Sequence, residues 1–435
     1  MKDDAIQVGL LGLGTVGSGV AQALQTKAAS IARRVGRPVV LRRALVRDLA
    51  RERVVPRTLL TGDPAEILED PTIDIVVELL GGEEPAYQYM LAALDHGKLV
   101  VTANKEVMAK HGPEVLARAA ARGLDVAFEA SVGGGIPVIG PFRLDLLAND
   151  IQEVTAIING TTNYILTQMA RGGVGYSEAL RDAQALGYAE PDPRNDVEGI
   201  DAAYKLTILA TLAFHARVRP EDVYVEGITR LAAADFRYAH ELGYAIKLLA
   251  IARQTTRGIE LRVHPAFLAS TDMLASVDGV YNAVSVEGDL VGRILFYGRG
   301  AGAGPTASAV VADVIDLAQR LQAGGGRAPV LPALDTARRL LPISEVWTRY
   351  YLRLVVVDRP GVIAQITKVL GDHEISLASV IQKETVEVAG AGEVAHAEIV
   401  LMTHRARESA VQQAVREIAA LPVVAQVGSV IRVES

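Results

Sequence analysis

The segment Gly12-Leu13-Gly14-Thr15-Val16-Gly17 directly follows the apolar run Ile6–Leu11 and has the pattern G-x-G-x-x-G. Apolar residues at Val20 and Leu24 continue with the spacing of an amphipathic helix. Glycines at such positions let the backbone approach a pyrophosphate, which the free N–H groups of the helix N-terminus then bind. The strand–turn–helix context predicts a dinucleotide-binding turn, although a tight turn without a ligand has the same pattern.

Strand-like and helical segments alternate along residues 5–130. Apolar runs typical of buried strands recur, and amphipathic patterns typical of helices lie between them. This alternation predicts an α/β Rossmann-type parallel sheet with helices on both faces. The further strands are expected at 39–46, 73–80, 99–102 and 125–129, and the helices include 85–96 and 113–122.

The second expected strand ends in Ala44-Leu45-Val46-Arg47-Asp48. An acidic residue at this tip binds the ribose hydroxyls of the adenosine, whereas an arginine suits a 2′-phosphate. Because Arg47 precedes Asp48, we expect NADP to be the preferred cofactor, with NAD possible. A solvated surface position is the alternative for Arg47.

The pattern changes at the glycine-rich loop 132–137. Helices that are segregated from a mostly antiparallel sheet predict an α+β substrate and dimerisation domain in the region that follows. Its strands are expected at 153–158, 245–253, 259–263 and 281–286, and its helices at 163–170, 177–186 and 197–214.

The last stretch of the chain has the order β-α-β-β-α-β, which predicts a ferredoxin-like domain. Its elements are expected at 351–357, 362–370, 375–383, 395–401, 409–421 and 424–433. The predicted domains are a dinucleotide-binding domain (1–135, completed by a helix at about 305–322), a substrate-binding domain (136–304), a linker (323–347) and a regulatory domain (348–435).

Composition excludes several classes of function. The 435 residues carry a net charge of −7 without a basic arm, so we expect no nucleic-acid partner. No apolar run reaches the roughly 18 residues of a membrane span, and no signal peptide is visible, which favours the cytoplasm. The absence of cysteine excludes disulfides, cysteine metal sites and thiol nucleophiles.

Thr102-Ala103-Asn104-Lys105 follows an expected strand of the parallel sheet. Ligands of open α/β sheets bind at the carboxyl ends of the strands. We therefore expect Asn104 and Lys105 to face the cofactor or the substrate. A helix-capping turn that carries an exposed lysine is the alternative.

The segment Gly187–Asp201 is dense in carboxylates and prolines, and Asp201 lies four residues before Lys205, on the same helix face. A lysine in a partly dry cleft can act as a general acid or base, because burial lowers its pKa. The alternative is a surface ion pair worth about 0.3–0.5 kcal/mol. Residues 204–214 are almost wholly apolar, which argues against an exposed face.

Together these motifs resemble those of the homoserine dehydrogenase family. The matching segments, in chain order, are 9–17, 78–82, 102–105, 129–137, 159–166, 187–205 and 298–302. They span nearly all of the first 320 residues, which makes the resemblance specific. The tail is similar to an ACT domain through Asp358-Arg359-Pro360-Gly361-Val362.

The resemblance implies an NAD(P)-dependent oxidoreductase that interconverts L-homoserine and L-aspartate 4-semialdehyde, on the route to threonine, methionine and isoleucine. It implies that Lys205 donates a proton to the carbonyl oxygen, with Lys105 and Asp201 as further catalytic residues. The substrate-binding residues that it implies are Glu190, Asp201, Asp196, Tyr188 and Thr161.

The resemblance also implies positions for bound groups. The cofactor contacts beyond the glycine turn are Arg47, Thr102, Asn104, Lys105, Gly187 and Gly302. A sodium ion is implied at Glu129 and at the backbone of Val132, Gly134 and Ile136. A threonine effector is implied at Asp358, Gly361 and Val362 of the ACT domain, although this domain can instead serve only to pair chains in a homodimer or other homo-oligomer.

Two other functions compete with this interpretation. One is another amino-acid-linked NAD(P) oxidoreductase on the same architecture, and the other is a non-catalytic sensor of dinucleotide and amino acid. The lack of cysteine separates the chain from aspartate-semialdehyde dehydrogenases, which resemble enzymes with a cysteine nucleophile. The length leaves no room for a fused aspartate kinase, so we expect a monofunctional enzyme.

Overall fold

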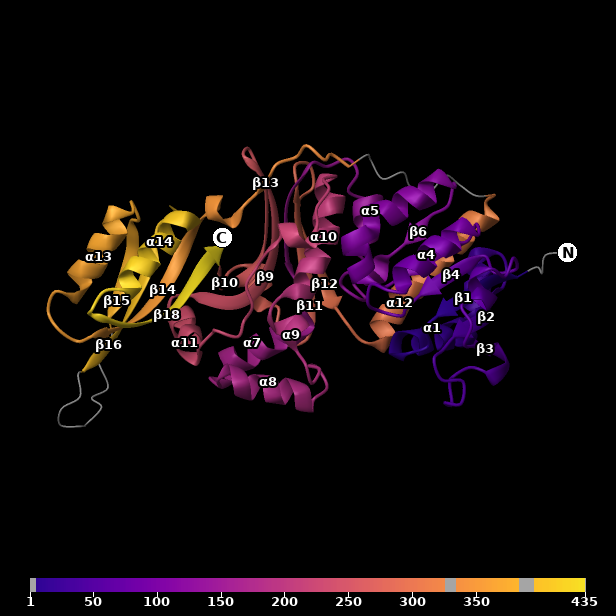
Figure 1. Cartoon of the computed structure of the whole chain (residues 1–435), viewed down its shortest axis with the longest axis horizontal. Coiled ribbons are helices and arrows are strands. Elements are labelled where there is room, and N and C mark those ends of the chain that lie inside the picture. Colours follow the sequence, from indigo (N-terminus) through magenta and orange to yellow (C-terminus); the bar gives the residue numbers. More distant parts are fainter. Residues whose placement is uncertain (1–4, 325–333, 383–394, 435) are drawn as a thin grey trace. The chain divides into compact units, whose positions relative to one another are not determined.

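The fold is described from a computed structural model, which covers residues 5–324, 334–382 and 395–434 (Figure 1). The chain forms two compact units. The first unit consists of Met1–Val154, Ala203–Glu221 and Tyr281–Arg338. The second unit consists of Thr155–Ala202, Asp222–Val280 and Arg339–Ser435. The predicted linker falls partly on 325–333, and that part lies outside the described residues.

The first unit is built on a six-stranded sheet with the order β3-β2-β1-β4-β5-β6. Every described pairing in it is parallel, which confirms the predicted Rossmann-type sheet. All residues of β1 and β4 are buried, because helices cover both faces of such a sheet. The strands are β1 (Ile6–Leu11), β2 (Val39–Leu45), β3 (Leu60–Thr61), β4 (Ile75–Glu78), β5 (Leu99–Thr102) and β6 (Val126–Ala127).

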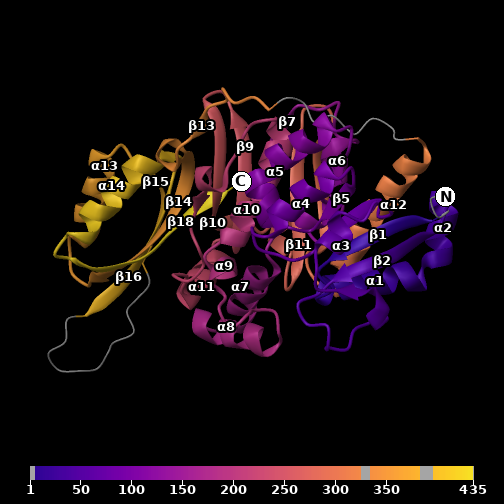
Figure 2. The ribbon, with the colours of Figure 1, turned by 45° about the vertical axis from the view of Figure 1, so that its right-hand side comes forward.

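A helix from a distant part of the sequence completes the core of the first unit. Helix α12 (Ala303–Gln322) lies beside α1 (Thr15–Thr26) in Figures 1 and 2, and buried residues such as Val314 join those of α1 and β1 in one cluster. The other helices are α2 (Ala28–Val35), α3 (Ala65–Leu68), α4 (Ala86–Asp95), α5 (Lys105–Ala121) and α6 (Ile139–Arg143).

Two predicted elements of this region were wrong in their extent, and one strand was missed. Helix α5 begins at Lys105, and Pro113, the predicted start, lies inside it. The strand predicted at 125–129 is only Val126–Ala127, because the chain turns into a 3-10 helix at Glu129. In the hairpin of β11 (Tyr281–Gly288) and β12 (Gly292–Arg299), strand β12 was not predicted, since five of its eight residues are glycine, arginine or tyrosine.

The second unit contains a mixed sheet with the strand order β9-β10-β18-β14-β16-β15. Long β9 (Tyr244–Thr255) and β10 (Gly258–Ala269) form an antiparallel pair. Helices α7 (Gly160–Gly172), α8 (Tyr176–Ala185), α9 (Arg194–Val197) and α11 (Ala233–Glu241) accompany them. The helix predicted at 197–214 is divided, because Gly199 has a φ of +82° between α9 and α10 (Ile200–Phe214).

The C-terminal part of the second unit has the predicted ferredoxin-like order. Helices α13 and α14 lie on one face of the sheet in Figure 1, and buried side chains such as Leu354, Ile366 and Ile418 fill the space between. Its elements are β14 (Trp347–Val357), α13 (Val362–Asp372), β15 (Leu377–Gln382), β16 (His396–Thr403), α14 (Glu408–Ala419) and β18 (Val424–Glu434). Lys383, the predicted end of β15, lies outside the described residues.

Strand β10 joins this C-terminal sheet to the rest of the second unit. One edge of β10 pairs with β9, and the other edge pairs in parallel with three short stretches of chain. These are β13 (Leu340–Leu341), β8 (Tyr224–Val225) and the end of β18, where Ala266 lies opposite Arg432. In the described ranges, no helix is long and apolar enough to cross a membrane.

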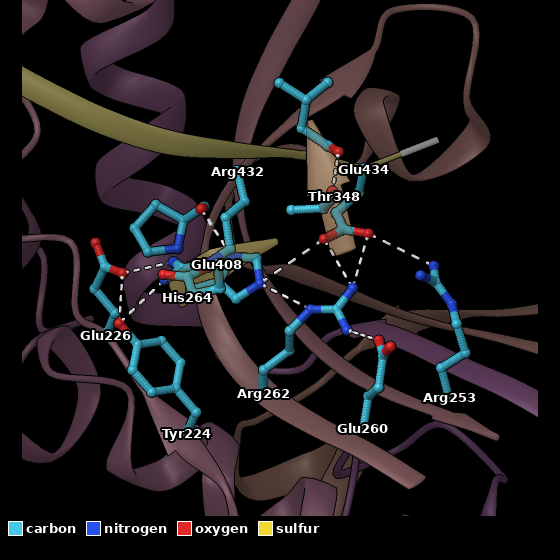
Figure 3. Close-up of polar contacts among 12 residues, drawn as sticks. Tyr224, Glu226, Arg253, Glu260, Arg262, His264, Thr348, Glu408, Arg432 and Glu434 are labelled. Carbon is cyan, nitrogen blue, oxygen red and sulfur yellow. Dashed lines mark hydrogen bonds and ion pairs between the residues drawn. The ribbon is translucent and has the colours of Figure 1, made fainter. Parts of the chain in front are cut away.

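A buried ion network holds β10 to β18 (Figure 3). The side chain of Arg262 is fully buried and contacts Glu260, while its other terminal nitrogen donates to both carboxylate oxygens of Glu434 at 2.9 and 3.0 Å. The Nε of Arg262 donates to Nε2 of His264 at 3.2 Å. Removing one partner from a buried ion pair leaves an uncompensated charge. The end of β18 is therefore part of the core around β10.

His264 makes the stability of this junction depend on pH. Burial, together with the positive charges of Arg432 and Arg262, holds the pKa of His264 well below its usual 6.5. Glu434, whose oxygen lies 3.9 Å from the ring, also faces it. The unfolded chain takes up a proton near pH 6.5, and the folded chain does so only at lower pH. This contribution to stability is therefore present above pH 6.5 and is lost as the pH falls through the folded pKa.

We expect His264 to lower the free energy of unfolding by about 1.4 kcal/mol for each pH unit below about 6.5. Urea unfolding between about pH 7 and pH 5 measures this dependence. His264→Gln keeps an acceptor for Arg262 but does not titrate, so its stability should fall less steeply with acidification. Equal slopes for the two proteins would contradict the assignment.

Candidate active site

The glycine turn forms a tight cradle between β1 and α1. Gly12 has a φ of +102°, and a Cβ on Gly17 would lie 2.2 Å from the carbonyl oxygen of Gly12. No side chain fits at Gly17 without moving the helix. Gly14, the N-cap of α1, has no atom within 4 Å of the place where a Cβ would stand. The turn is thus closed on the protein side and open on the other, which fits a pyrophosphate at a helix N-terminus.

Arg53 lies against this turn and was not predicted. One terminal nitrogen donates to the carbonyl oxygen of Leu13 at 2.7 Å, while the Nε is buried without a partner among the described residues. Arg47, the predicted phosphate contact, is exposed just after β2. No sequence pattern pointed to Arg53, because this residue lies in the irregular segment between β2 and β3.

A buried hydrogen-bond chain fixes the carboxyl ends of β4 and β5. The carboxylate of Glu78 accepts from the Thr102 hydroxyl at 2.6 Å, and this hydroxyl oxygen accepts from the backbone N–H of Asn104 at 2.9 Å. The Asn104 side chain caps α5 through the N–H of Val107 and donates to the Gly82 carbonyl. Burial raises the pKa of Glu78.

This chain of contacts determines where Lys105 stands. Lys105 is the first residue of α5 and is half-buried, so its position follows directly from the Asn104 cap. The predicted residues Thr102, Asn104 and Lys105 are therefore brought together at the sheet edge where ligands of this fold bind. Glu78, which supports them, belongs to a motif of the resemblance but was not predicted as a site residue.

Glu129 is held by backbone N–H groups. One carboxylate oxygen accepts from Val138 and Ile139 at 2.6 and 2.8 Å, and the other accepts from Gly140 at 2.7 Å. The N–H of Glu129 donates to Asp313 on α12, and burial raises the pKa of Asp313 to about 8. The Glu129 side chain therefore fixes the loop that connects the sheet to α6.

The two glycine-rich loops of the first unit pack against each other. A Cβ on Gly134 would lie 2.3 Å from the carbonyl oxygen of Gly300, and the N–H of Gly135 donates to the backbone carbonyl oxygen of Arg299 at 3.2 Å. Gly302, with a φ of +120°, is the N-cap of α12. The loop that contains the predicted sodium contacts thus supports the loop that contains a predicted cofactor contact.

The substrate side of the predicted site lies in the second unit. The amide of Asn159 donates to Asp196 at 2.7 Å and to Asp201 at 2.8 Å, and its oxygen caps α7 through Thr162. Asp201 is buried with 3% of its surface exposed. Asn159 was not predicted as a site residue, although it opens one of the motifs of the resemblance. It brings Asp196 and Asp201 together.

Thr161 and Tyr188 also lie together. The Thr161 hydroxyl donates to the carbonyl oxygen of Tyr188 at 2.7 Å, and the rings of Tyr188 and Tyr164 lie 5.0 Å apart. Gly187 reaches this turn with a φ of +76°. Glu190 is exposed, and its backbone carbonyl accepts from Gln184.

Helix α10 carries the predicted proton donor. Asp201 lies in its first turn, and the half-buried Lys205 follows four residues later. At the other end of the chain, Gly361 is the N-cap of α13 with a φ of +87°, next to the buried Val362 and the exposed Asp358.

Comparison with known proteins places the chain in a family. Sequence models described as homoserine dehydrogenase, NAD binding domain, as homoserine dehydrogenase and as ACT domain match residues 12–129, 137–315 and 350–423. A homoserine dehydrogenase of Neisseria gonorrhoeae is 44% identical over 437 residues, which cover 99% of each chain. The chain belongs to the homoserine dehydrogenase family.

Solved structures agree with this assignment. A homoserine dehydrogenase of Thiobacillus denitrificans has a TM-score of 0.93 and is 47% identical, with 99% of this chain and 98% of that chain covered. By sequence, a homoserine dehydrogenase of Pseudomonas aeruginosa is 45% identical, with 98% of each chain covered. The chain is thus an oxidoreductase with a nicotinamide-dinucleotide-binding domain and a C-terminal ACT domain, and a non-catalytic sensor is not favoured.

The two glycines of the turn should respond differently to alanine. Gly17→Ala places a methyl group against the Gly12 carbonyl, and we expect it to cost about 1–3 kcal/mol of stability, as overpacking does. Gly14→Ala meets no protein atom, so the melting temperature should stay unchanged while NADPH binding weakens. Thermal unfolding without cofactor and fluorescence titration with NADPH separate the two effects. Full-strength NADPH binding by Gly14→Ala would contradict the cradle.

Proposed function

We propose that this chain, a member of the homoserine dehydrogenase family, interconverts L-homoserine and L-aspartate 4-semialdehyde with NAD(P). The observation that carries the proposal is helix α10, which holds the buried Asp201 and, one turn later, the half-buried Lys205. A sensor has no need for an acid–base lysine at this place. Support comes also from the relatives that share the whole length of the chain.

The dinucleotide is expected at the glycine turn of the first unit. Gly12 and Gly17 let the turn close tightly against the protein, and Gly14 leaves the other side open for the pyrophosphate. The N-terminal N–H groups of α1, including those of Thr15 and Val16, are proposed to bind it. When bound, the nicotinamide exchanges a hydride with the reacting carbon of the substrate. Lys105 lies at the nicotinamide end in this proposal, positioned by Asn104. Gly187 and Gly302 complete the predicted cofactor contacts.

Lys205 moves the proton. In homoserine oxidation, the Nζ of neutral Lys205 accepts the proton of the substrate hydroxyl. The carbon that carries this hydroxyl loses its hydride to the dinucleotide, so that a C=O bond forms. In the reverse direction, the ammonium group stabilises the negative charge that grows on the aldehyde oxygen and then protonates it. Asp201, held by Asn159, is proposed to orient the substrate at this lysine.

The amino-acid part of the substrate is proposed to bind in the second unit. Its ammonium group needs carboxylates, which Glu190 and Asp196 are proposed to supply. Asn159 holds Asp196 together with Asp201. Thr161 and Tyr188 form the turn beside these carboxylates. A substrate held by several charged groups in one orientation loses less entropy when the reaction begins.

Three finer points extend this proposal. We propose a sodium ion at Glu129 and the carbonyl oxygens of Val132, Gly134 and Ile136, which accept no hydrogen bond from a described residue. No cluster of three or more acidic, histidine or cysteine side chains that would hold a metal occurs in the described ranges, so backbone oxygens have to supply most ligands. The Glu129 carboxylate accepts three N–H groups, so about one of its four acceptor sites remains for the cation.

The ACT domain is proposed to bind threonine at Asp358, Gly361 and Val362, in a homodimeric cytoplasmic enzyme. Deleting residues 348–435 is not a clean test of this regulation. The deletion would remove Glu434 from the fully buried Arg262 and expose the edge of β10. A point variant such as Asp358→Asn leaves that core intact.

We expect Lys205→Ala to abolish homoserine oxidation while the dissociation constant for NADPH stays unchanged. A positioned general acid or base contributes about a hundredfold to ten-thousandfold in rate. In the wild type, oxidation should accelerate with rising pH as Lys205 loses its proton. Turnover measured by the absorbance of reduced nicotinamide, with the exposed Lys368→Ala as matched control, tests both points. Unchanged turnover in Lys205→Ala removes this residue from the mechanism.

Cofactor preference is proposed to favour NADP. A solved structure of a hyperthermophilic archaeal homoserine dehydrogenase is a complex with NADPH. Arg47→Gln should raise KM for NADP more than for NAD if Arg47 meets the 2′-phosphate. Arg53→Gln, beside the shared pyrophosphate position, should raise both KM values by a similar factor of about ten. If instead Arg53→Gln raises KM for NADP more than for NAD, and Arg47→Gln does not, the 2′-phosphate contact belongs to Arg53.

A further inference from the structure

A cavity of about 460 Å³ opens in the second unit where β18 separates from β10. Strand β8 lies on one side of it, and residues 427–432 of β18 lie on the other. Both strands pair with the same edge of β10, β8 at Arg262 and β18 only from Arg432 onward. The volume lies within the range of about 300–1,000 Å³ that is typical of small-molecule sites. None of the proposed catalytic or substrate-binding residues lines it.

Arg432 lines this cavity and forms its charged floor, and Figure 3 shows the polar contacts of its side chain. It donates to Glu408 at 2.6 and 2.8 Å, to Glu226 at 2.7 Å and to the Tyr224 hydroxyl at 3.2 Å. Its side chain is only 4% exposed, whereas that of Glu226 is 34% exposed. The floor is therefore rigid, and the Glu226 carboxylate is its accessible charge.

The walls add one charge of each sign. Arg230 and Glu198 both line the cavity and both are exposed. A ligand that is only an anion would be repelled by Glu198 and Glu226. A ligand that is only a cation would be repelled by Arg230 and Arg432. A ligand that carries both charges at a short distance satisfies the two groups of side chains together.

The edge of β18 supplies backbone partners. Residues 427–431 pair with β14 on one side, and no described strand pairs with their other side until Arg432. Alternate residues of such an edge direct their N–H and C=O groups outward. Val427, Leu231 and Pro265 add apolar surface to the same cavity.

We infer that this cavity binds a free α-amino acid in its zwitterionic form. The carboxylate lies at Arg230, the ammonium group lies between Glu198 and Glu226, and the side chain rests on the apolar surface. The outward N–H groups of β18 donate to the ligand's carboxylate, and its outward C=O groups accept from the ligand's ammonium group. This site is separate from the Asp358–Val362 turn, which does not line the cavity.

Occupancy of the cavity reaches the substrate side through one short segment. The N–H of Ile228 donates to the carbonyl oxygen of Val197 at 2.8 Å, and a Cβ on Gly227 would lie 2.7 Å from Cα of Glu198. Glu198 follows α9, which contains Asp196, and precedes α10, which contains Asp201. A ligand that draws Glu198 into the cavity therefore acts on the two aspartates that Asn159 holds. This coupling rests on the proposed function, whereas binding itself does not.

Isothermal titration of the full-length protein without dinucleotide, using the standard L-amino acids one at a time, tests the inference. We expect at least one of them to bind, and its amide and its N-acetyl derivative to fail, because each lacks one of the two charges. Arg230→Gln should weaken binding by about tenfold to a hundredfold, as expected for loss of a charge-assisted hydrogen bond. Glu198→Gln should weaken it in the same direction.

Two matched variants complete the test. Arg237→Gln removes an exposed arginine of the same unit outside the cavity and should bind like the wild type. Lys368→Ala removes an exposed charge of α13 outside the cavity and should also bind like the wild type. The inference is overturned if no amino acid binds or if Arg230→Gln binds normally. Because the readout is heat of binding, none of these results depends on whether the chain turns over homoserine.

Discussion

The contact between Gly17 and the carbonyl oxygen of Gly12 determines where α1 begins on the parallel sheet, since a single methyl group would separate them. The N-terminus of α1 therefore reaches the carboxyl edge of the strands, where Glu78, Thr102 and Asn104 place Lys105. Helix α12, which starts at Gly302, packs its buried residues into the same core as α1 and β1. One steric constraint thus gathers the cofactor-facing residues of the first unit.

In the second unit, buried ion pairs fix the arrangement of the elements. Arg262 and Arg432 are held by carboxylates of β10, β18 and α14, so the ACT domain shares its core with the sheet of the substrate-binding region. Such networks are costly to bury and costly to break, which makes them suited to fixing one arrangement. The cavity beside Arg432 lies at this junction, and the segment 196–201 connects it with Asp201.

Much of this architecture follows from local sequence patterns. The glycine turn, the alternation of strands and helices and the C-terminal β-α-β-β-α-β order each depend on neighbouring residues, and these predictions were confirmed. Arg53, Asn159 and the role of Glu78 were missed, because their partners lie far away in the sequence or in irregular chain. The start of α5 was missed since Pro113 suggested a boundary, whereas the Asn104 cap sets it.

The central claim is that the glycine cradle and Lys205 serve one reaction, the oxidation of L-homoserine by a bound dinucleotide. The most direct measurement is the appearance of reduced nicotinamide when the protein is mixed with L-homoserine and NADP or NAD at alkaline pH. The account predicts turnover that requires L-homoserine, with NADP as the better cofactor. Folded protein that binds NADP but reduces neither dinucleotide in the presence of L-homoserine would contradict it.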